Sequence, residues 1–521
     1  TQIEDGRIFQ YANVDFSPVY QCLHIHDILK QRNEFSSYYK ENRKLQCDLA
    51  LQLDSDFSYK KGTEKAERFA KYFNHVAAFY IIESYVYKTT DNFISYDTLE
   101  DLWIHGTNIM KNVIDKLLNT ENVESLCYLL DSISLFKDTM KEYSYDVSTW
   151  ESMLANISEI CAQKSLEYAH KEFTKVFENE KYEPMSINRK DKKYKELIIS
   201  NSLEEDELKN IGSGNQISFP FSSAVPVVCN LIKVFLGQIH DFSRYSKKPE
   251  HQVSSTIERL LMEMSNCIVL CMEESYSHSN VAQLVQIHQN LSQFSKFIKI
   301  VVGEILLGFR YSKWIVKQTL SPVLDAFKSA HENAEDMITK LCKDKFSAFF
   351  SLSLNINWNS SNPRKDAHEN IHDFGIYLGA IHQMLKPLDN ELQDILLTRI
   401  HSNIGSKFLL LLSDEVSSFN INAVKDIQTD LNYLISIASD KHHKKSSTEG
   451  LKEILETISL LGNSSPSIYL DKKEREKQYP SISPETLDRI LQKYRPNNNL
   501  VRKEIDESSL QQLKSKISSL Y

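Results

Sequence analysis

The pattern with the clearest chemical potential is His368-Glu369-Asn370-Ile371-His372, a formal HExxH sequence. On a helix, its two histidines would share one face and could bind zinc beside a glutamate acting as general base. A longer zinc motif would continue with a third histidine, but Leu378 stands at that position. The alternative is the solvent-facing start of an amphipathic helix whose apolar side is Ile371, Phe374, Leu378 and Ile381. We favour this helix over a zinc hydrolase, and we expect neither a metal nor a cofactor.

No other residue set forms a catalytic pattern. His24 and His26 flank Ile25 and therefore point to different sides of a helix. Cys267 and Cys271 lie one helical turn apart, but no second pair exists to complete a metal site. The cysteines occur singly, mostly among apolar neighbours, which is typical of reduced core residues in a cytosolic protein. We therefore expect a protein that is not an enzyme.

The composition favours an all-helical protein. Among 521 residues there are only 13 Gly and 12 Pro, too few turn-forming residues for a large barrel, sandwich or doubly wound sheet. Apolar residues recur at helical spacing, and the alternation typical of strands is nowhere sustained. A net charge of -9 argues against nucleic-acid binding, which needs a concentrated basic surface. No uncharged apolar stretch is long enough for a spanning helix.

The apolar spacing predicts a succession of helices separated by a few polar breaks. The entry Asp15-Phe16-Ser17-Pro18 predicts Ser17 as N-cap and Pro18 as the first helical residue. The stretch 441–447 is expected to be a loop, and a short helix is possible at 192–200. The expected helices are 18–29, 34–51, 63–87, 97–119, 122–142, 146–178, 224–245, 252–276, 280–306, 312–352, 366–385, 388–418, 421–439, 449–461, 484–493 and 503–519.

Breaks in composition divide the chain into five parts. We expect an N-terminal helical bundle over 1–180, a linker with a possible short helix over 181–222, and a middle helical bundle over 223–354. A C-terminal helical bundle over 355–462 and a polar tail with short helices over 463–521 complete the prediction. The tail is expected to be loosely attached. Because the chain opens at Thr1 without methionine, we expect it to be a fragment of a longer protein.

Several segments, taken together, resemble one known family. The segment from Asp15 to Ile25, DFSPVYQCLHI, followed by Tyr38-Tyr39-Lys40 and Arg43-Lys44-Leu45-Gln46, closely resembles the Sec15 family. Further similar segments occur in the same order and cover residues 10 to 440. They are Phe219-Pro220-Phe221-Ser222, Val225-Pro226, Leu284-Val285-Gln286-Ile287 with Asn290, Phe327-Lys328, Ala334-Glu335, Thr339-Lys340-Leu341 and Trp358.

The resemblance implies a fold, an activity and partners. The Sec15 family is the Rab-binding subunit of the exocyst vesicle-tethering complex, and its fold is an elongated rod of consecutively stacked helical bundles. The implied role is non-catalytic: binding a GTP-loaded Rab GTPase on secretory vesicles and other exocyst subunits, so that vesicles are tethered to the plasma membrane. The implied location is cytoplasmic, peripheral on secretory vesicles and at plasma-membrane sites of polarised exocytosis. The alternative is a structural exocyst scaffold without a Rab site of its own.

The resemblance also indicates where a Rab would bind. The family's contact is attributed to late helices of the C-terminal half, which correspond here to 420–437. Helical spacing places an inward stripe at Ile421, Val424, Ile427, Leu431 and Leu434. The opposite, solvent-facing side supplies the predicted Rab-binding residues, centred on Gln428. They are Asn422, Lys425, Asp426, Gln428, Thr429 and Asn432.

Overall fold

The computed structural model describes residues 14–52, 63–91, 93–120, 122–188, 190–191, 209–211, 216–245, 250–351, 357–437, 441–496 and 505–520. Helices account for most of these residues, so the predicted all-α class is confirmed. The chain forms two compact units. Unit 1 comprises 1–176, 227–267 and 302–322, and unit 2 comprises 177–226, 268–301 and 323–521. The five-part division drawn from composition stays a prediction.

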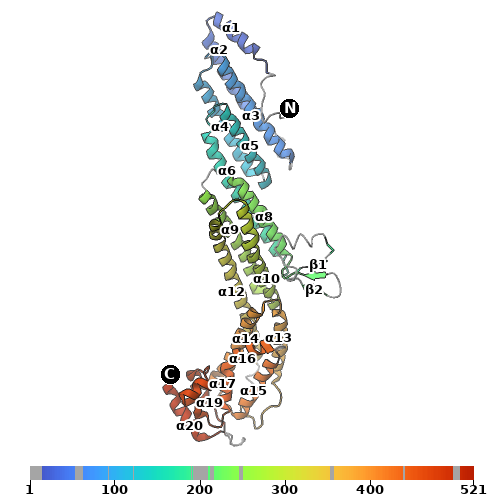
Figure 1. Ribbon diagram of the computed structural model, residues 1–521, viewed down its shortest axis with the longest axis vertical. Helices are drawn as coiled ribbons and strands as arrows, with labels where there is room; N and C mark the ends of the chain where they lie inside the picture. Colours follow the sequence, from blue (N-terminus) through green and yellow to red (C-terminus); the bar gives the residue numbers. More distant parts are fainter. Residues whose placement is uncertain are drawn as a thin grey trace. The chain divides into compact units, whose positions relative to one another are not determined.

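Unit 1 begins with helices that pack against one another. Figure 1 shows α2 to α5 alongside each other, and α2 also packs against α1. These helices are α1 (Ser17–Ile28), α2 (Arg32–Ala50), α3 (Thr63–Thr89), α4 (Tyr96–Thr120) and α5 (Val123–Glu142). They are followed by α6 (Ser148–Glu178), most of α8 (Ala224–Ser243) and α9 (Glu250–Glu274), then α11 (Gly303–Gly308) and the start of α12 (Lys313–Ser351).

An aromatic cluster fills the core between α3, α4, α5 and α6. The Trp103 ring lies 4.9 Å from that of Tyr80 and 4.8 Å from that of Tyr145, and the Phe136 and Trp150 rings are 5.0 Å apart. All five side chains are buried. Such large aromatic rings contribute much of the apolar area that holds a helical bundle together.

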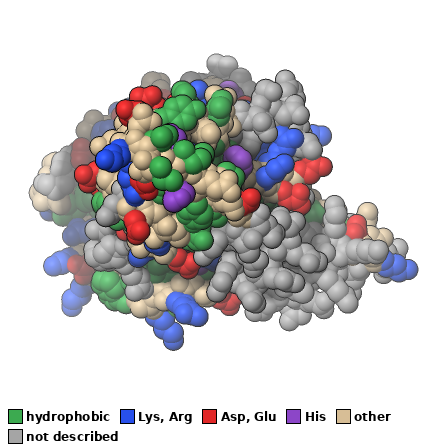
Figure 2. Space-filling view, turned by 90° about the horizontal axis from the view of Figure 1, so that it is seen from above, with side chains coloured by type: hydrophobic (Ala, Val, Ile, Leu, Met, Phe, Trp, Pro, Cys, Tyr) green, Lys and Arg blue, Asp and Glu red, His purple; other side chains and the backbone are tan. Residues whose placement is uncertain are grey.

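The first helix begins one residue earlier than expected. Ser17 is the first helical residue rather than the N-cap, and its backbone N–H donates to the Asp15 carboxylate at 2.9 Å. The outer side of α1 exposes Ile25, Ile28 and Leu29. Figure 2 views the molecule from this end and shows apolar side chains gathered with histidines and bordered by charged residues.

Among the described residues, α8 is the one helix long and apolar enough to cross a membrane by length and composition. Its side chains Val228, Ile232 and Leu236 are buried inside the protein, and Lys233 interrupts its apolar sequence. This burial is typical of a helix that packs within a bundle.

Unit 2 is also helical, with shorter elements toward its C-terminal end. It contains η4 (Tyr276–His278), α10 (Val281–Phe297), the π-helix η5 (Ile298–Val302), most of α12, α13 (Glu369–Leu385), α14 (Asn390–Leu410), the π-helix η7 (Leu411–Glu415) and α15 (Ile421–Ser436). The remaining elements are α16 (Lys441–Gly450), α17 (Lys452–Leu461), η8 (Pro466–Leu470), α18 (Lys472–Gln478), α19 (Pro484–Lys493), α20 (Glu507–Lys516) and η9 (Ile517–Leu520).

Unit 2 also holds a small sheet that the sequence did not predict. Strands β1 (Ser186–Asn188), β2 (Lys209–Ile211) and β3 (Gln216–Ser218) are antiparallel in the order β1-β3-β2. Ser218 is paired with Ser186 on one side and with Lys209 on the other. Three residues per strand are too few to show an alternation in the sequence. The short helix expected at 192–200 lies outside the described residues.

The loop expected at 441–447 is instead the start of helix α16, which packs against α14. Ser446 and Ser447 are buried, and the Ser446 hydroxyl donates to the Asp394 carboxylate at 2.5 Å. Gly450 allows the close approach, since a Cβ there would lie 2.5 Å from the Thr398 carbonyl oxygen. These polar residues therefore form a helix because they pack against α14. Local composition does not reveal such a contact.

The expectation of a loosely attached tail is wrong. Tyr469 and Tyr494 are fully buried, and helix α19 packs against η7. The Tyr494 hydroxyl donates to the Leu461 carbonyl at 2.7 Å, which joins the tail to the end of α17. An ion pair of 3.3 Å between Arg489 and Asp414 adds a surface contact. Several side chains of the described part of 463–520 thus belong to the core of unit 2.

Candidate partner-binding surface

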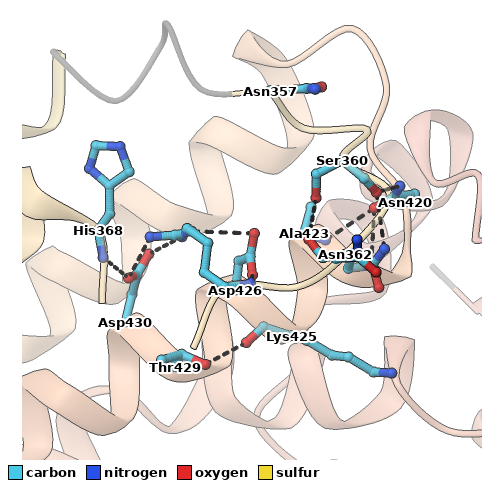
Figure 3. Close-up of polar contacts among 12 residues, drawn as sticks. Asn357, Ser360, Asn362, His368, Asn420, Ala423, Lys425, Asp426, Thr429 and Asp430 are labelled. Carbon is cyan, nitrogen blue, oxygen red and sulfur yellow. Dashed lines mark hydrogen bonds and ion pairs between the residues drawn. The ribbon is translucent and has the colours of Figure 1, made fainter. Parts of the chain in front are cut away.

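Helix α15 begins at a side-chain cap that also ties it to a preceding segment. The Asn420 side-chain oxygen accepts hydrogen bonds from the backbone N–H groups of Asn422 and Ala423, at 3.0 and 3.1 Å. Its amide nitrogen donates to the Ser360 carbonyl at 2.8 Å, and its backbone N–H donates to the Trp358 carbonyl at 3.1 Å. Residues 357–368 therefore lie over the first turns of α15 (Figure 3).

This covering segment buries two of the predicted Rab-binding residues. The Asn422 amide donates to the Ser360 carbonyl at 3.0 Å. The Asp426 carboxylate accepts from the Arg364 backbone N–H at 2.5 Å, and its other oxygen lies 3.3 Å from the Arg364 Nε. Both residues are buried, so the prediction that they face solvent is wrong. A polar helix face can be covered by a polar segment, and helical spacing alone does not distinguish this from solvent.

The other four predicted residues lie on one accessible side of α15. Gln428 and Asn432 are exposed, whereas Lys425 and Thr429 are half-buried. Steps of three or four residues bring these side chains onto adjacent turns of the same face. The Thr429 hydroxyl donates to the Lys425 carbonyl at 3.0 Å and so turns back toward its own helix (Figure 3). The predicted inward stripe is confirmed, because Ile421, Val424, Ile427, Leu431 and Leu434 are all buried.

Two charged residues that the sequence analysis missed fasten the covering segment. The guanidinium of Arg364 bonds both carboxylate oxygens of Asp430, at 3.0 and 3.4 Å, and the His368 backbone N–H donates to the same carboxylate at 2.8 Å. Burial raises the pKa of Asp430, and these two partners oppose the shift. The one local signal of this contact in the sequence is the spacing of Asp426 and Asp430, which places two carboxylates on one helix face. Two like charges four residues apart destabilise a helix, so a nearby cation is expected.

The neighbouring helix α13 extends the accessible surface beside α15. The His372 and Tyr433 rings are stacked with centroids 5.3 Å apart, and the Tyr433 hydroxyl donates to the His372 carbonyl at 3.4 Å. Gly375 lies under Tyr433, where a Cβ would come within 2.5 Å of a ring carbon. The absence of a side chain at Gly375 thus lets the two helices approach closely.

The HExxH sequence forms the beginning of α13. His368 precedes the helix as its N-cap, and its Nδ1 accepts a hydrogen bond from the Asn370 backbone N–H at 3.2 Å. The predicted apolar side is confirmed, since Ile371, Phe374, Leu378 and Ile381 are buried. Within the described ranges, no three His, Cys, Asp or Glu residues are grouped so that they could hold a metal ion.

The described cysteines are free, and partial or full burial holds three of them in the thiol form. Burial raises the pKa of Cys127 to about 11 and that of Cys161 and Cys342 to about 12. A thiolate is the nucleophilic form, so these side chains are poor nucleophiles at neutral pH.

The fold and this surface define a class: all-helical proteins whose exposed helix faces are suited to protein–protein contacts. The chain belongs to the family described as exocyst complex subunit Sec15 C-terminal, whose model matches residues 150–493. It is 25% identical to exocyst complex component 6 of Dictyostelium discoideum, over 94% of this chain and 52% of that protein. It is 24% identical to exocyst complex component SEC15A of Arabidopsis thaliana, over 95% and 63%, and 23% identical to exocyst complex component 6 of Homo sapiens, over 80% and 52%.

The chain thus spans between about half and two thirds of the length of these relatives. Among solved structures, it is similar to the crystal structure of a Sec15 C-terminal domain, with 17% identity and a TM-score of 0.40 over 60% of this chain and 98% of that chain. It is also similar to the C-terminal domain of the exocyst subunit Sec6p, with 13% identity and a TM-score of 0.43 over 71% and 91%.

Proposed function

We propose that this chain is a non-catalytic part of an exocyst subunit that takes part in tethering secretory vesicles to the plasma membrane. The observation that carries the proposal is the family match over residues 150–493. Its partners are other exocyst subunits and a GTP-loaded Rab GTPase on the vesicle. The protein acts in the cytoplasm, in peripheral contact with secretory vesicles and with the plasma membrane where exocytosis is polarised.

The accessible face of α15 supports the Rab-binding part of this proposal. Lys425, Gln428, Thr429 and Asn432 provide polar groups of both hydrogen-bonding types on one helix side. Asn422 and Asp426 have a different role, since they hold residues 357–368 against the helix instead of reaching a partner. We therefore restrict the proposed contact to the four accessible residues, with Gln428 at the centre.

Dependence on GTP follows from how a Rab changes shape. The γ-phosphate and its Mg²⁺ order the switch segments of a small GTPase, and hydrolysis releases them. A preformed helix face that contacts the ordered segments binds the GTP form more tightly, because the GDP form must first be ordered at a cost in entropy. The fixed cap and the covered side of α15 supply such a preformed face.

A second candidate is a structural exocyst scaffold without its own Rab site. It is favoured by the burial of Asn422 and Asp426, which leaves a smaller accessible face than the sequence predicts. The chain also spans only part of its relatives, so Rab recognition could depend on residues outside the matched length.

A binding titration separates the two candidates. The chain is titrated with an exocytic Rab loaded with a non-hydrolysable GTP analogue and, in parallel, with the same Rab loaded with GDP. Binding to the GTP form alone supports the Rab-binding function. Equal binding to both forms, or no binding, leaves the scaffold as the better description.

A further inference from the structure

A cavity of about 300 Å³ opens between α2 and α4 in unit 1. It lies outside the region matched by the family model and on a different unit from α15. Its volume is at the lower end of the range found for pockets that bind small ligands. We therefore asked what chemistry its walls would recognise.

A buried polar network forms part of the lining. The Tyr39 hydroxyl donates to the Glu83 carboxylate at 3.3 Å, and Arg43 forms an ion pair with that carboxylate. The side chain of Glu83 is 2% exposed, and the Arg43 guanidinium also lies 4.4 Å above the Phe79 ring. A buried ion pair contributes little more to stability than well-packed apolar side chains would. Its place beside a cavity therefore supports a binding role.

The two walls of the cavity differ in chemistry. The α2 wall carries three cations, Lys40, Arg43 and Lys44. The α4 wall is mixed: Leu99 and Leu102 are buried and Ile104 is exposed, and Thr98, Asp101 and His105 line the cavity beside them. Asp101 on the α4 side pairs with Lys40 at 3.5 Å, but both side chains are more than half exposed. Such an exposed pair is weak, so Lys40 can exchange Asp101 for a carboxylate of a partner.

We propose that this cavity is a docking site for an acidic amphipathic helix of a partner protein. One large apolar side chain of that helix would enter the cavity against Leu99 and Leu102, and a second apolar side chain would reach Ile104. Its glutamate or aspartate residues would lie along α2, against Lys40 and Lys44. A groove between two helices that binds the apolar face of a third is a recurring mode of recognition.

The test uses two blocked, fluorescently labelled peptides and the full chain. One peptide is an amphipathic helix with leucines at helical spacing and glutamates beside them, and the other has every glutamate replaced by glutamine. Fluorescence anisotropy measures the affinity of each peptide at low and high salt. We expect saturable binding of the glutamate peptide, about ten-fold tighter than that of the glutamine peptide and weakened by salt.

Two variants and two matched controls locate the binding. Lys40→Gln/Lys44→Gln removes the exposed cations, and Ile104→Glu places a negative charge at a position that is 52% exposed. Each should weaken binding of the glutamate peptide about ten-fold without changing the thermal melt. The controls are Lys111→Gln/Lys141→Gln, at two exposed lysines elsewhere in unit 1, and Leu135→Glu, at a residue that is 54% exposed on α5. Both controls should bind as the unaltered chain does.

Three outcomes would overturn the proposal: no saturable binding, equal binding of the two peptides, or binding that the cavity variants leave unchanged. A parallel arm mixes the chain with phosphatidylcholine vesicles, with and without phosphatidylserine. Lysine-dependent binding to the anionic vesicles, combined with failure of the peptide, would show that the partner class is wrong. None of these outcomes depends on whether the Rab titration succeeds, because α15 is unaltered in every variant.

Discussion

Arg364 and Asp430 form a forked ion pair, with Nη2–Oδ2 at 3.0 Å and Nη1–Oδ1 at 3.4 Å. The pair closes residues 357–368 over α15 and separates the covered side of that helix from its accessible side. The Asp430 side chain is 4% exposed and that of Arg364 is 28% exposed, so solvent screens the pair only partly. This contact explains why Asp426 is buried under residues 357–368 whereas Gln428, on the same helix, is exposed.

Asp430→Asn should destabilise unit 2 by about 1–3 kcal/mol, because Arg364 loses one of its two charged partners while the His368 N–H keeps an acceptor. The measurement is the midpoint of thermal unfolding, together with amide hydrogen exchange of α15. Asp373→Asn, at an exposed position on α13, serves as control and should leave both unchanged. An Asp430 variant as stable as this control would show that the ion pair does not hold the segment.

Gln428→Arg should abolish GTP-dependent Rab binding and leave the thermal melt unaltered, because the side chain is exposed. A large charged side chain at the centre of a docking face costs at least ten-fold in affinity. Asp426→Asn should do the reverse, lowering the melting temperature through its lost pairing with Arg364 while contacting no partner directly. Unchanged affinity in the Gln428 variant would contradict the proposed site.

Unit 2 should lose stability as the pH falls below about 6.5, because buried histidines resist protonation. The His288 and His331 rings are 4.4 Å apart, and burial lowers the pKa of His288 to about 3 and that of His331 to about 4. Burial likewise lowers the pKa of His401 to about 4. A depressed histidine pKa means that the unfolded chain binds more protons between pH 6.5 and 4, so acid favours unfolding.

Each such histidine corresponds to about 2 kcal/mol of lost stability at pH 5 relative to pH 7. Burial raises the pKa of Glu335 and Asp430, which opposes the trend at low pH, so a difference between variants is the cleaner measurement. Unfolding free energies at pH 7 and pH 5 are compared for the unaltered chain, His401→Gln and His24→Gln. We expect a smaller pH effect only in the His401 variant. An equal effect in all three chains would refute the assignment.

Gly375→Ala should destabilise the packing of α13 on α15 by about 1–3 kcal/mol, because the new Cβ would lie 2.5 Å from Tyr433 and 2.7 Å from Ile437. Gly379→Ala is a matched control on the same helix, where the nearest atom would be 3.5 Å away. That control should be neutral or more stable, since alanine favours a helix. Chemical denaturation measures the free energy of unfolding of both variants. Equal values for the two would mean that α13 and α15 can move apart without a loss of stability.

Elements with a clear apolar period could be predicted closely. Helix α19 has the bounds 484–493 in both the prediction and the structure, helped by Ser483 as N-cap and Pro484 at the first helical position. The helix predicted over 280–306 is interrupted by the π-helix η5, and the one over 388–418 ends in the π-helix η7. These wider turns depend on packing between helices. The spacing of apolar residues in the sequence does not indicate such packing.

The candidate surface could be predicted only in part. The buried stripe of α15 followed from spacing, and so did the common face of Lys425, Gln428, Thr429 and Asn432. The burial of Asp426 could not follow, because its partner Arg364 is 62 residues away in the chain. Polar pairing over such a distance leaves no local pattern, whereas apolar periodicity does.

The tail pairs with the residue that directly precedes the α15 cap. The Arg495 backbone N–H donates to the Phe419 carbonyl at 2.9 Å, and the Phe419 and Tyr494 rings stack with centroids 5.2 Å apart. During synthesis, this pairing must wait until residue 495 has left the ribosome, long after α15 itself has emerged. The contact between the tail and Phe419 therefore forms last. A nascent chain that has not yet been extended to residue 495 would expose α15 without this contact.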